Sequence, residues 1–257
     1  MIKNPGYQND TDLRKKYAAK MCAVLRLIAK ALRQLHHSDL VHGNLCMANC
    51  GKFDHSWKLL DTMGLVRIGS VIDPVRFDQS VPPEALRIDD GEGAVFDSDN
   101  PPVAFQFIQA NPSVDIWAFG KLAYETLVGQ PLVAFEPTIT TAEDTVSLLE
   151  ILEWDHSSLK SVFTGLLDSG VTESCAEVVT SCLFPNPKDR PANMDAILDD
   201  PFWKDMRQYR ERSSPSKQSS PIRTVPAGIS QSLFTANASV NTSVELDIEA
   251  INSFLPE

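Results

Sequence analysis

Hydrophobic residues in the first part of the chain recur at three- and four-residue steps, the period of a helix that is buried on one side. Asp10 or Thr11 can cap its N-terminus, and the pattern predicts one long helix that ends near His36. The apolar stripe consists of Leu13, Tyr17, Met21, Val24, Leu25, Ile28, Leu32 and Leu35. Residues 1 to 10 form a polar lead-in to this helix.

The pattern changes after His36. A polar loop is followed by a short β-rich run from Trp57 to Leu60, so we expect short β-hairpins near residues 41 to 60. Helical periodicity returns later in the chain, over residues 145–153, 159–167, 175–184 and 194–198. The predicted fold class is mainly α, with the short hairpins making it an α+β fold.

Two stretches lack the periodicity of packed elements. Residues 85–114 are rich in Gly, Asp and Pro, which predicts an exposed, acidic inserted loop. Residues 207–257 are rich in Ser, Pro, Thr and Asn, a composition typical of a disordered tail. Near its end, a short helix would place Ile248, Ile251, Phe254 and Leu255 on one side; a disordered end fits this segment equally well.

Composition and net charge argue against some classes of binding partner. The chain has 257 residues, 43% of them hydrophobic, which is enough for one sizeable core. A net charge of −11 with scattered cations argues against a nucleic-acid or anionic-membrane surface. No apolar run reaches the ~20 residues of a membrane span, so we expect a soluble, cytoplasmic protein.

The cysteine pattern does not complete a metal site. Cys46 and Cys50 are four residues apart, and His55 is the one nearby side chain that could act as a third ligand. We expect no bound metal and five reduced, mostly buried thiols.

The chain is organised around the loop His42-Gly43-Asn44-Leu45-Cys46-Met47-Ala48-Asn49. It resembles the catalytic loop H-R-D-x-x-x-x-N of the eukaryotic protein kinase family, with HGN in place of HRD. The family's metal-binding D-F-G is matched best by Thr62-Met63-Gly64, 18 residues after Asn44. A one-residue slip would instead place Asp61 at the D-F-G aspartate.

Three further motifs resemble this family and follow in its order. Asp115-Ile116-Trp117-Ala118-Phe119-Gly120 matches D-x-W-x-F-G, Pro82-Pro83-Glu84 matches A-P-E, and Arg190 lies in the family's late Arg context. The resemblance implies that Asp115 accepts hydrogen bonds from the backbone of residues 42–44 and that Glu84 pairs with Arg190. The simpler alternatives are a helix cap for Asp115 and a solvated loop carboxylate for Glu84.

These motifs span residues 11–206 and imply the large C-terminal lobe of a kinase. The family's Gly-rich loop and strand lysine find no match before the long helix, so we expect the N-terminal lobe to be absent from this chain. Either the protein consists of the large lobe alone or the sequence is truncated.

The positions at which this sequence differs from the family are those that take part in catalysis. Asn44 stands at the catalytic Asp, and a neutral amide cannot act as a general base. Thr62, at the position of the D-F-G Asp, offers only a hydroxyl to Mg²⁺, which is a weak ligand. The remaining potential ligands are Asn49 and, if the register slips by one residue, Asp61. Together these residues would form a degenerate Mg-ATP site. The structural positions are retained: His42, Asp115, Trp117, Gly120, Glu84 and Arg190.

Retained scaffold and lost chemistry are typical of a pseudokinase. The leading hypothesis is a catalytically inactive interaction or scaffold module in signalling, without a cofactor, which binds a protein partner such as another kinase. The alternative is a fragment of an active ATP-dependent Ser/Thr-type kinase, which would use ATP and Mg²⁺. A third interpretation is the non-functional product of a truncated gene.

Overall fold

The structure is a computed structural model, which describes residues 11–53, 56–61, 65–73, 80–88, 103–133 and 148–203. The polar lead-in, the centre of the acidic loop and the tail predicted for residues 207–257 lie outside the described residues. The same is true of His55 and Thr62.

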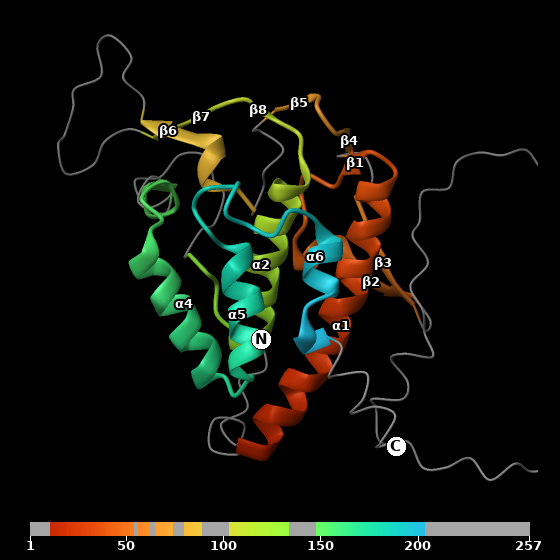
Figure 1. Cartoon of the computed structure of the whole chain (residues 1–257), viewed down its shortest axis with the longest axis vertical. Coiled ribbons are helices and arrows are strands. Elements are labelled where there is room, and N and C mark those ends of the chain that lie inside the picture. Colours follow the sequence, from red (N-terminus) through yellow and green to blue (C-terminus); the bar gives the residue numbers. More distant parts are fainter. Residues whose placement is uncertain are drawn as a thin grey trace, which may run out of the picture.

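The helices form the body of the molecule, with α2 at its centre (Figure 1). Helix α2 packs against α1, α4 and α5; α1 also packs against α6, and α4 against α5. The helices are α1 (Thr11–His37), α2 (Pro112–Val128), α4 (His156–Asp168), α5 (Glu173–Cys182) and α6 (Met194–Leu198). The predicted mainly helical fold is therefore confirmed.

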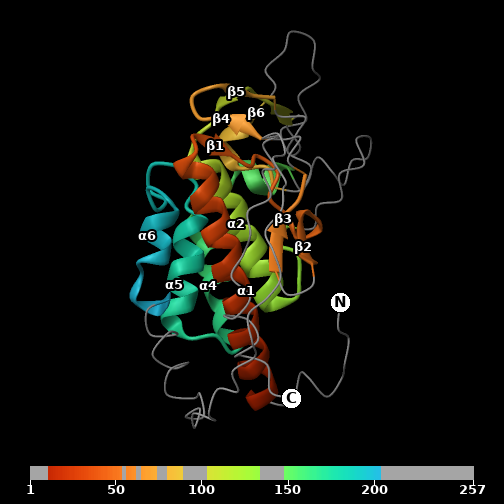
Figure 2. The same ribbon diagram turned by 90° about the vertical axis from the view of Figure 1, so that its right-hand side faces the viewer.

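The strands form four antiparallel pairs: β1 (Leu40–Val41) with β4 (Val66–Arg67), β2 (Cys50–Phe53) with β3 (Ser56–Leu59), β5 (Val71–Ile72) with β8 (Ile108–Gln109), and β6 (Leu86–Ile88) with β7 (Val103–Phe105). The pair β2–β3 is the predicted hairpin and packs against α1 (Figure 2). The other three pairs gather at one end of the helices (Figure 1).

Local sequence features explain where the two long helices form. Helix α1 follows its apolar stripe and carries Asp12 in its first turn and His36 and His37 in its last, which suits the helix dipole. Helix α2 starts where the Asn111 side chain accepts a hydrogen bond from the Ser113 N–H, with Pro112 at the first helical position. The cap of α2 is therefore Asn111, and the alternative interpretation of Asp115 as the cap is wrong.

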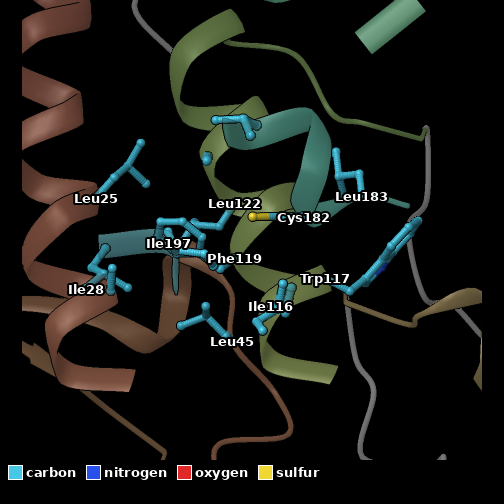
Figure 3. Close-up of a cluster of buried hydrophobic side chains, with 14 of the residues drawn as sticks. Leu25, Ile28, Leu45, Ile116, Trp117, Phe119, Leu122, Cys182, Leu183 and Ile197 are labelled. Carbon is cyan, nitrogen blue, oxygen red and sulfur yellow. The ribbon is translucent and has the colours of Figure 1, made fainter. Parts of the chain in front are cut away.

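The core lies where α1, α2 and α5 meet. Figure 3 shows Trp117, Phe119 and Leu122 of α2 packed among side chains from these helices and from α6. Gly120 permits the close approach of α2 and α5, because a Cβ atom there would lie 2.8 Å from Cys182 Cβ and 2.9 Å from Leu183 Cγ. The close packing of α2 against Cys182 and Leu183 therefore explains the glycine inside this helix.

Several predicted boundaries need correction. The inserted loop, 85–114, is too wide, since residues 86–88 pair with 103–105 and α2 already begins at Pro112. Helix α4 begins three residues early because Asp155 caps it in a capping box with Ser158. Of the helix predicted at 145–153, the structure describes residues 148–152 as helical. In the first turn of α1, Leu13 is exposed rather than buried.

Candidate functional site

One carboxylate of α2, that of Asp115, holds the backbone of the loop that follows β1. Asp115 accepts a hydrogen bond from the His42 N–H at 2.7 Å and another from the Gly43 N–H at 2.9 Å. The bracing that the sequence predicted for Asp115 is present. Gly43 has a φ of 73°, a left-handed conformation that suits glycine and lets two successive N–H groups turn toward one carboxylate.

A third donor to Asp115 was not anticipated. His36, in the last turn of α1, lies with its Nε2 3.0 Å from Asp115 Oδ2, and both side chains are buried. Burial alone raises the pKa of Asp115, but the hydrogen bond and charge of His36, together with His42, bring that pKa below its ordinary value. The signal in the sequence was a histidine at the end of the predicted helix, six residues before His42.

His42 uses both of its ring nitrogens within the fold. Its Nε2 donates to the Leu60 carbonyl at 2.9 Å, and its Nδ1 accepts from the Asn44 N–H at 3.3 Å. Because a carbonyl can only accept and an N–H can only donate, these two contacts define the tautomer. The side chain is only 1% exposed, so its position agrees with a structural rather than a proton-transfer role.

Two hydrogen bonds link Asn49, Asn44 and Asp61 at the outer side of the loop, one through the Asn44 backbone and one through its side chain. Asn49 donates through Nδ2 to the Asn44 carbonyl at 2.8 Å, and Asn44 donates through Nδ2 to Asp61 Oδ2 at 3.3 Å. Asn44 Oδ1 is buried and has no hydrogen-bond partner among the described residues. Asp61 is exposed and adopts a left-handed φ of 56°.

The structure thus brings Asn44, Asn49 and Asp61 together. The carboxylate of Asp61 and the amide oxygen of Asn49 are oxygen donors of the kind that Mg²⁺ takes, and they fit a magnesium site that also uses water and phosphate oxygens. Such an ion would neutralise charge on a nucleotide's phosphates. Asn44, which the sequence resemblance aligned with the family's catalytic Asp, presents an amide, which cannot accept a proton at neutral pH.

An ion pair fixes the segment after this loop to the helical lobe. Arg190, which is 4% exposed, donates to both carboxylate oxygens of Glu84, at 2.8 and 2.7 Å. Its Nε also donates to the Phe184 carbonyl, and its guanidinium lies 5.0 Å from the centre of the Trp117 ring. The pair expected from the two motifs is present, and the alternative of a solvated Glu84 is wrong.

Two further contacts complete the frame. Trp117 is buried and packs edge-to-face on Trp154, with ring centroids 5.6 Å apart. Ser80 is also buried and donates through Oγ to the Leu45 carbonyl, so it ties the segment before Glu84 directly to the loop. The Ser80 contact was not predicted, because a lone serine carries no sequence signal.

All five cysteines are free and buried. Burial, with a smaller contribution from Cys46, raises the pKa of Cys50 to about 12, so this thiol stays protonated. The described part of the chain contains no group of three or more His, Cys, Asp or Glu side chains arranged to hold a metal ion. Among the described helices, none combines the length and apolarity needed to span a bilayer.

Known proteins similar to this chain are protein kinases, although no family model matches it. The chain is 26% identical over 210 residues to the calcium and calcium/calmodulin-dependent serine/threonine-protein kinase of Lotus japonicus. This match covers 78% of the chain and 34% of the relative, so the chain spans about a third of that protein's length.

Solved kinase structures are also similar. PK-1 of Cydia pomonella granulovirus matches with a TM-score of 0.48 and 17% identity, over 72% of this chain and 58% of the other. The Rad53 kinase domain with SCD2, in complex with AMPPNP, matches with a TM-score of 0.45 and 17% identity, over 72% and 60%.

The fold of this chain is protein kinase-like. The sequence similarity to a Ser/Thr kinase supports this description. So do the ordered motifs, whose side chains make the contacts that the resemblance implied: Asp115 with the loop backbone, and Glu84 with Arg190.

Proposed function

We propose that this chain is a kinase-like interaction module in signalling that does not transfer phosphoryl groups. The observation that carries the proposal is Asn44, which stands where the kinase family has its catalytic Asp. Phosphoryl transfer to a hydroxyl needs a carboxylate there to orient the nucleophile and accept its proton. The amide of Asn44 donates to Asp61 instead, so the neighbouring carboxylate is engaged as an acceptor.

The frame around the loop supports a role that depends on shape. Buried hydrogen bonds hold the loop through Asp115, and the ion pair of Glu84 and Arg190 holds the following segment. A surface fixed in this way can bind a protein partner, such as another kinase, without turning over a substrate. On this proposal the module requires no cofactor.

A second candidate function is favoured by Asp61. Since Asp61 and Asn49 both lie beside Asn44, two oxygen donors for Mg²⁺ remain at the site. The chain would then be part of a longer, ATP-dependent Ser/Thr-type kinase with an unusual catalytic loop. This alternative requires the phosphate-covering lobe to be supplied by sequence beyond the present chain.

The test is a phosphotransfer assay with labelled ATP and Mg²⁺ or Mn²⁺, using a general protein substrate. Wild type, Asp61→Ala and Asn44→Asp would be compared, with Asp189→Ala as the control because Asp189 is an exposed carboxylate in the late Arg motif. We expect wild type to give no transfer above the Asp61→Ala background. Transfer by wild type that Asp61→Ala abolishes and Asp189→Ala leaves intact would favour the active-kinase alternative.

A further inference from the structure

Two buried thiols from distant parts of the sequence contact each other. Cys22 of α1 lies with its Sγ atom 3.7 Å from the Sγ atom of Cys175, in the first turn of α5, and the two positions are 153 residues apart. The two side chains are 4% and 2% exposed. The sulfur atoms are therefore in direct contact inside the core.

The surroundings hold both helices at this contact. Ala18 lies one turn before Cys22 on the same face of α1, and Val179 lies one turn after Cys175 on α5; both are buried. Nearer the start of α1, the Arg14 guanidinium donates to the Asp168 carbonyl at the end of α4, at 3.0 Å. The two sulfur atoms need to approach by about 1.7 Å more to reach the length of an S–S bond, and rotation of the two χ1 torsions is the movement that brings them together.

The other three cysteines, which the structure also describes, have different surroundings. The Cys182 thiol donates to the Val178 carbonyl of its own helix at 3.3 Å. Cys46 and Cys50 lie at the two ends of the short 3-10 turn Met47–Asn49, beside the candidate site. Cys22 and Cys175 are thus the pair in which one thiol faces another.

We propose that Cys22 and Cys175 are a site of reversible oxidation, at which a peroxide converts the two thiols to a disulfide that links α1 to α5. In the first step one sulfur attacks an oxygen of hydrogen peroxide, so that an S–O bond forms, the O–O bond breaks and water leaves. In the second step the other sulfur attacks the sulfenic acid, so that the S–S bond forms, the S–O bond breaks and a second water leaves. The peroxide accepts two electrons from the sulfur atoms, and the two thiol protons leave in the water. This inference does not depend on whether the site at Asn44 is catalytic.

The environment of the pair governs how fast it reacts. The hydrogen bond with Cys175, together with burial, raises the pKa of Cys22 well above its ordinary value. Since the thiolate is the reactive form, the folded pair reacts slowly, and the same burial protects the disulfide from reductants once it has formed. The site therefore suits a lasting response to sustained oxidation rather than a fast one.

The disulfide closes a loop that contains the whole candidate site. Asn44, Asp61 and Asp115 all lie between the two cysteines in the sequence. A cross-link between the ends of a long loop lowers the entropy of the unfolded chain, and this stabilisation grows with loop length. Helix α1 leads into the loop at His42, and α5 packs against α2, which carries Asp115. Oxidation should therefore stabilise the frame that holds the loop.

Peptide mapping and thermal unfolding of the full chain test the proposal. The folded protein would be treated with hydrogen peroxide, then denatured, alkylated with iodoacetamide, digested and analysed by mass spectrometry. Parallel samples would be melted with and without dithiothreitol. Cys22→Ala and Cys175→Ala each remove one sulfur of the pair. Cys50→Ala is the matched control, because it removes another buried thiol and leaves the pair intact.

We expect wild type and Cys50→Ala to give a peptide pair linked through Cys22 and Cys175, about 2 Da lighter than the two reduced peptides together. Their Tm should rise by about 5–15 °C on oxidation and return with dithiothreitol. Neither variant of the pair should show the link or the rise, and the wild-type map decides the question even if these variants fold poorly. Sulfinic acid without a link, a link that forms only in unfolded protein, or a link that lowers Tm would each overturn the proposal.

Discussion

Asp115 and Asn44 contact the same loop from two sides, and the fold treats them differently. Asp115 is a fully buried carboxylate whose oxygens receive three donors, from His36, His42 and Gly43. Asn44 is a partly buried amide whose nitrogen donates to the exposed Asp61 and whose oxygen has no partner among the described residues.

Asp115 holds the backbone of the loop in place, whereas Asn44 lies at the candidate functional site. A buried charge needs every one of its hydrogen bonds, so the surroundings of Asp115 tolerate little change. The outer side of the loop carries no such requirement, because the carboxylate of Asp61 is exposed to solvent and the amide of Asn44 carries no charge. The contacts that fix the kinase-like frame on the inner side therefore do not depend on which residue occupies position 44 on the outer side.

Asp115→Ala should have the largest effect on stability. Removal of the carboxylate leaves the His42 and Gly43 N–H groups and the His36 ring without their acceptor. We expect a loss of about 3–5 kcal/mol in the free energy of unfolding, measured by urea denaturation. Asn44→Ala serves as the comparison and should cost about 1 kcal/mol or less. Equal losses would contradict the division between the two sides.

A second substitution tests the other anchor. Arg190→Lys keeps the charge but removes the two-pronged contact with Glu84 and the bond from Nε to the Phe184 carbonyl. We expect a loss of about 2–3 kcal/mol in stability. Lys188→Met, at a nearby exposed cation, is the control and should change stability by less than about 0.5 kcal/mol. A lysine that fully replaces Arg190 would show that charge alone fixes the segment.

Two glycines in helices differ in how closely neighbouring side chains approach them. Gly120→Ala would force a Cβ atom into Cys182 and Leu183, and this overpacking should outweigh the gain in helix propensity, with a net loss of about 1–2 kcal/mol. At Gly165 the nearest atom to a new Cβ would be the Tyr124 hydroxyl, 3.2 Å away at the end of a half-buried side chain. Gly165→Ala should therefore be neutral or stabilising by up to about 1 kcal/mol. Calorimetric melting of both variants gives the comparison, and the reverse order would refute it.

The pH dependence gives a smaller effect with a definite sign. Because the folded-state pKa of Asp115 lies below its ordinary value of 3.8, the folded protein binds fewer protons there than the unfolded chain. The stabilisation is complete above that ordinary value and is lost as pH falls through the folded-state pKa. The stability gap between wild type and Asp115→Asn should therefore shrink between pH 5 and pH 3. A gap that stays constant over this range in urea titrations would be inconsistent with the lowered pKa.

Much of the frame could be predicted from the sequence because it depends on short local patterns. The stripe of α1 and the motifs around Asp115, Glu84 and Arg190 each follow a short spacing rule, and their contacts are present in the structure. The helix cap at Asn111 was missed because a stronger motif begins four residues later. The strands β6 and β7 were missed because they flank an acidic loop whose composition hid the pairing.

The details of the site depend on contacts across long sequence separations. No spacing rule indicated that His36 would share Asp115 with the loop, or that Ser80 would bond to Leu45. The register at Asp61 was open in the sequence, and the contact between Asn44 and Asp61 is a property of the fold. Thr62, the other candidate for that position, lies outside the described residues.

Nucleotide binding shows whether the site beside Asn44 can still hold ATP and a metal ion. Thermal unfolding of the full chain would be followed with ATP and Mg²⁺ or Mn²⁺, for wild type and Asp61→Ala. A ligand at a hundredfold excess over its dissociation constant stabilises the folded state by about 2.7 kcal/mol, so binding would be visible as a shift in Tm. We expect cooperative melting with no metal-dependent shift. A shift that requires the metal and disappears in Asp61→Ala would contradict it and show a working nucleotide site beside Asn44.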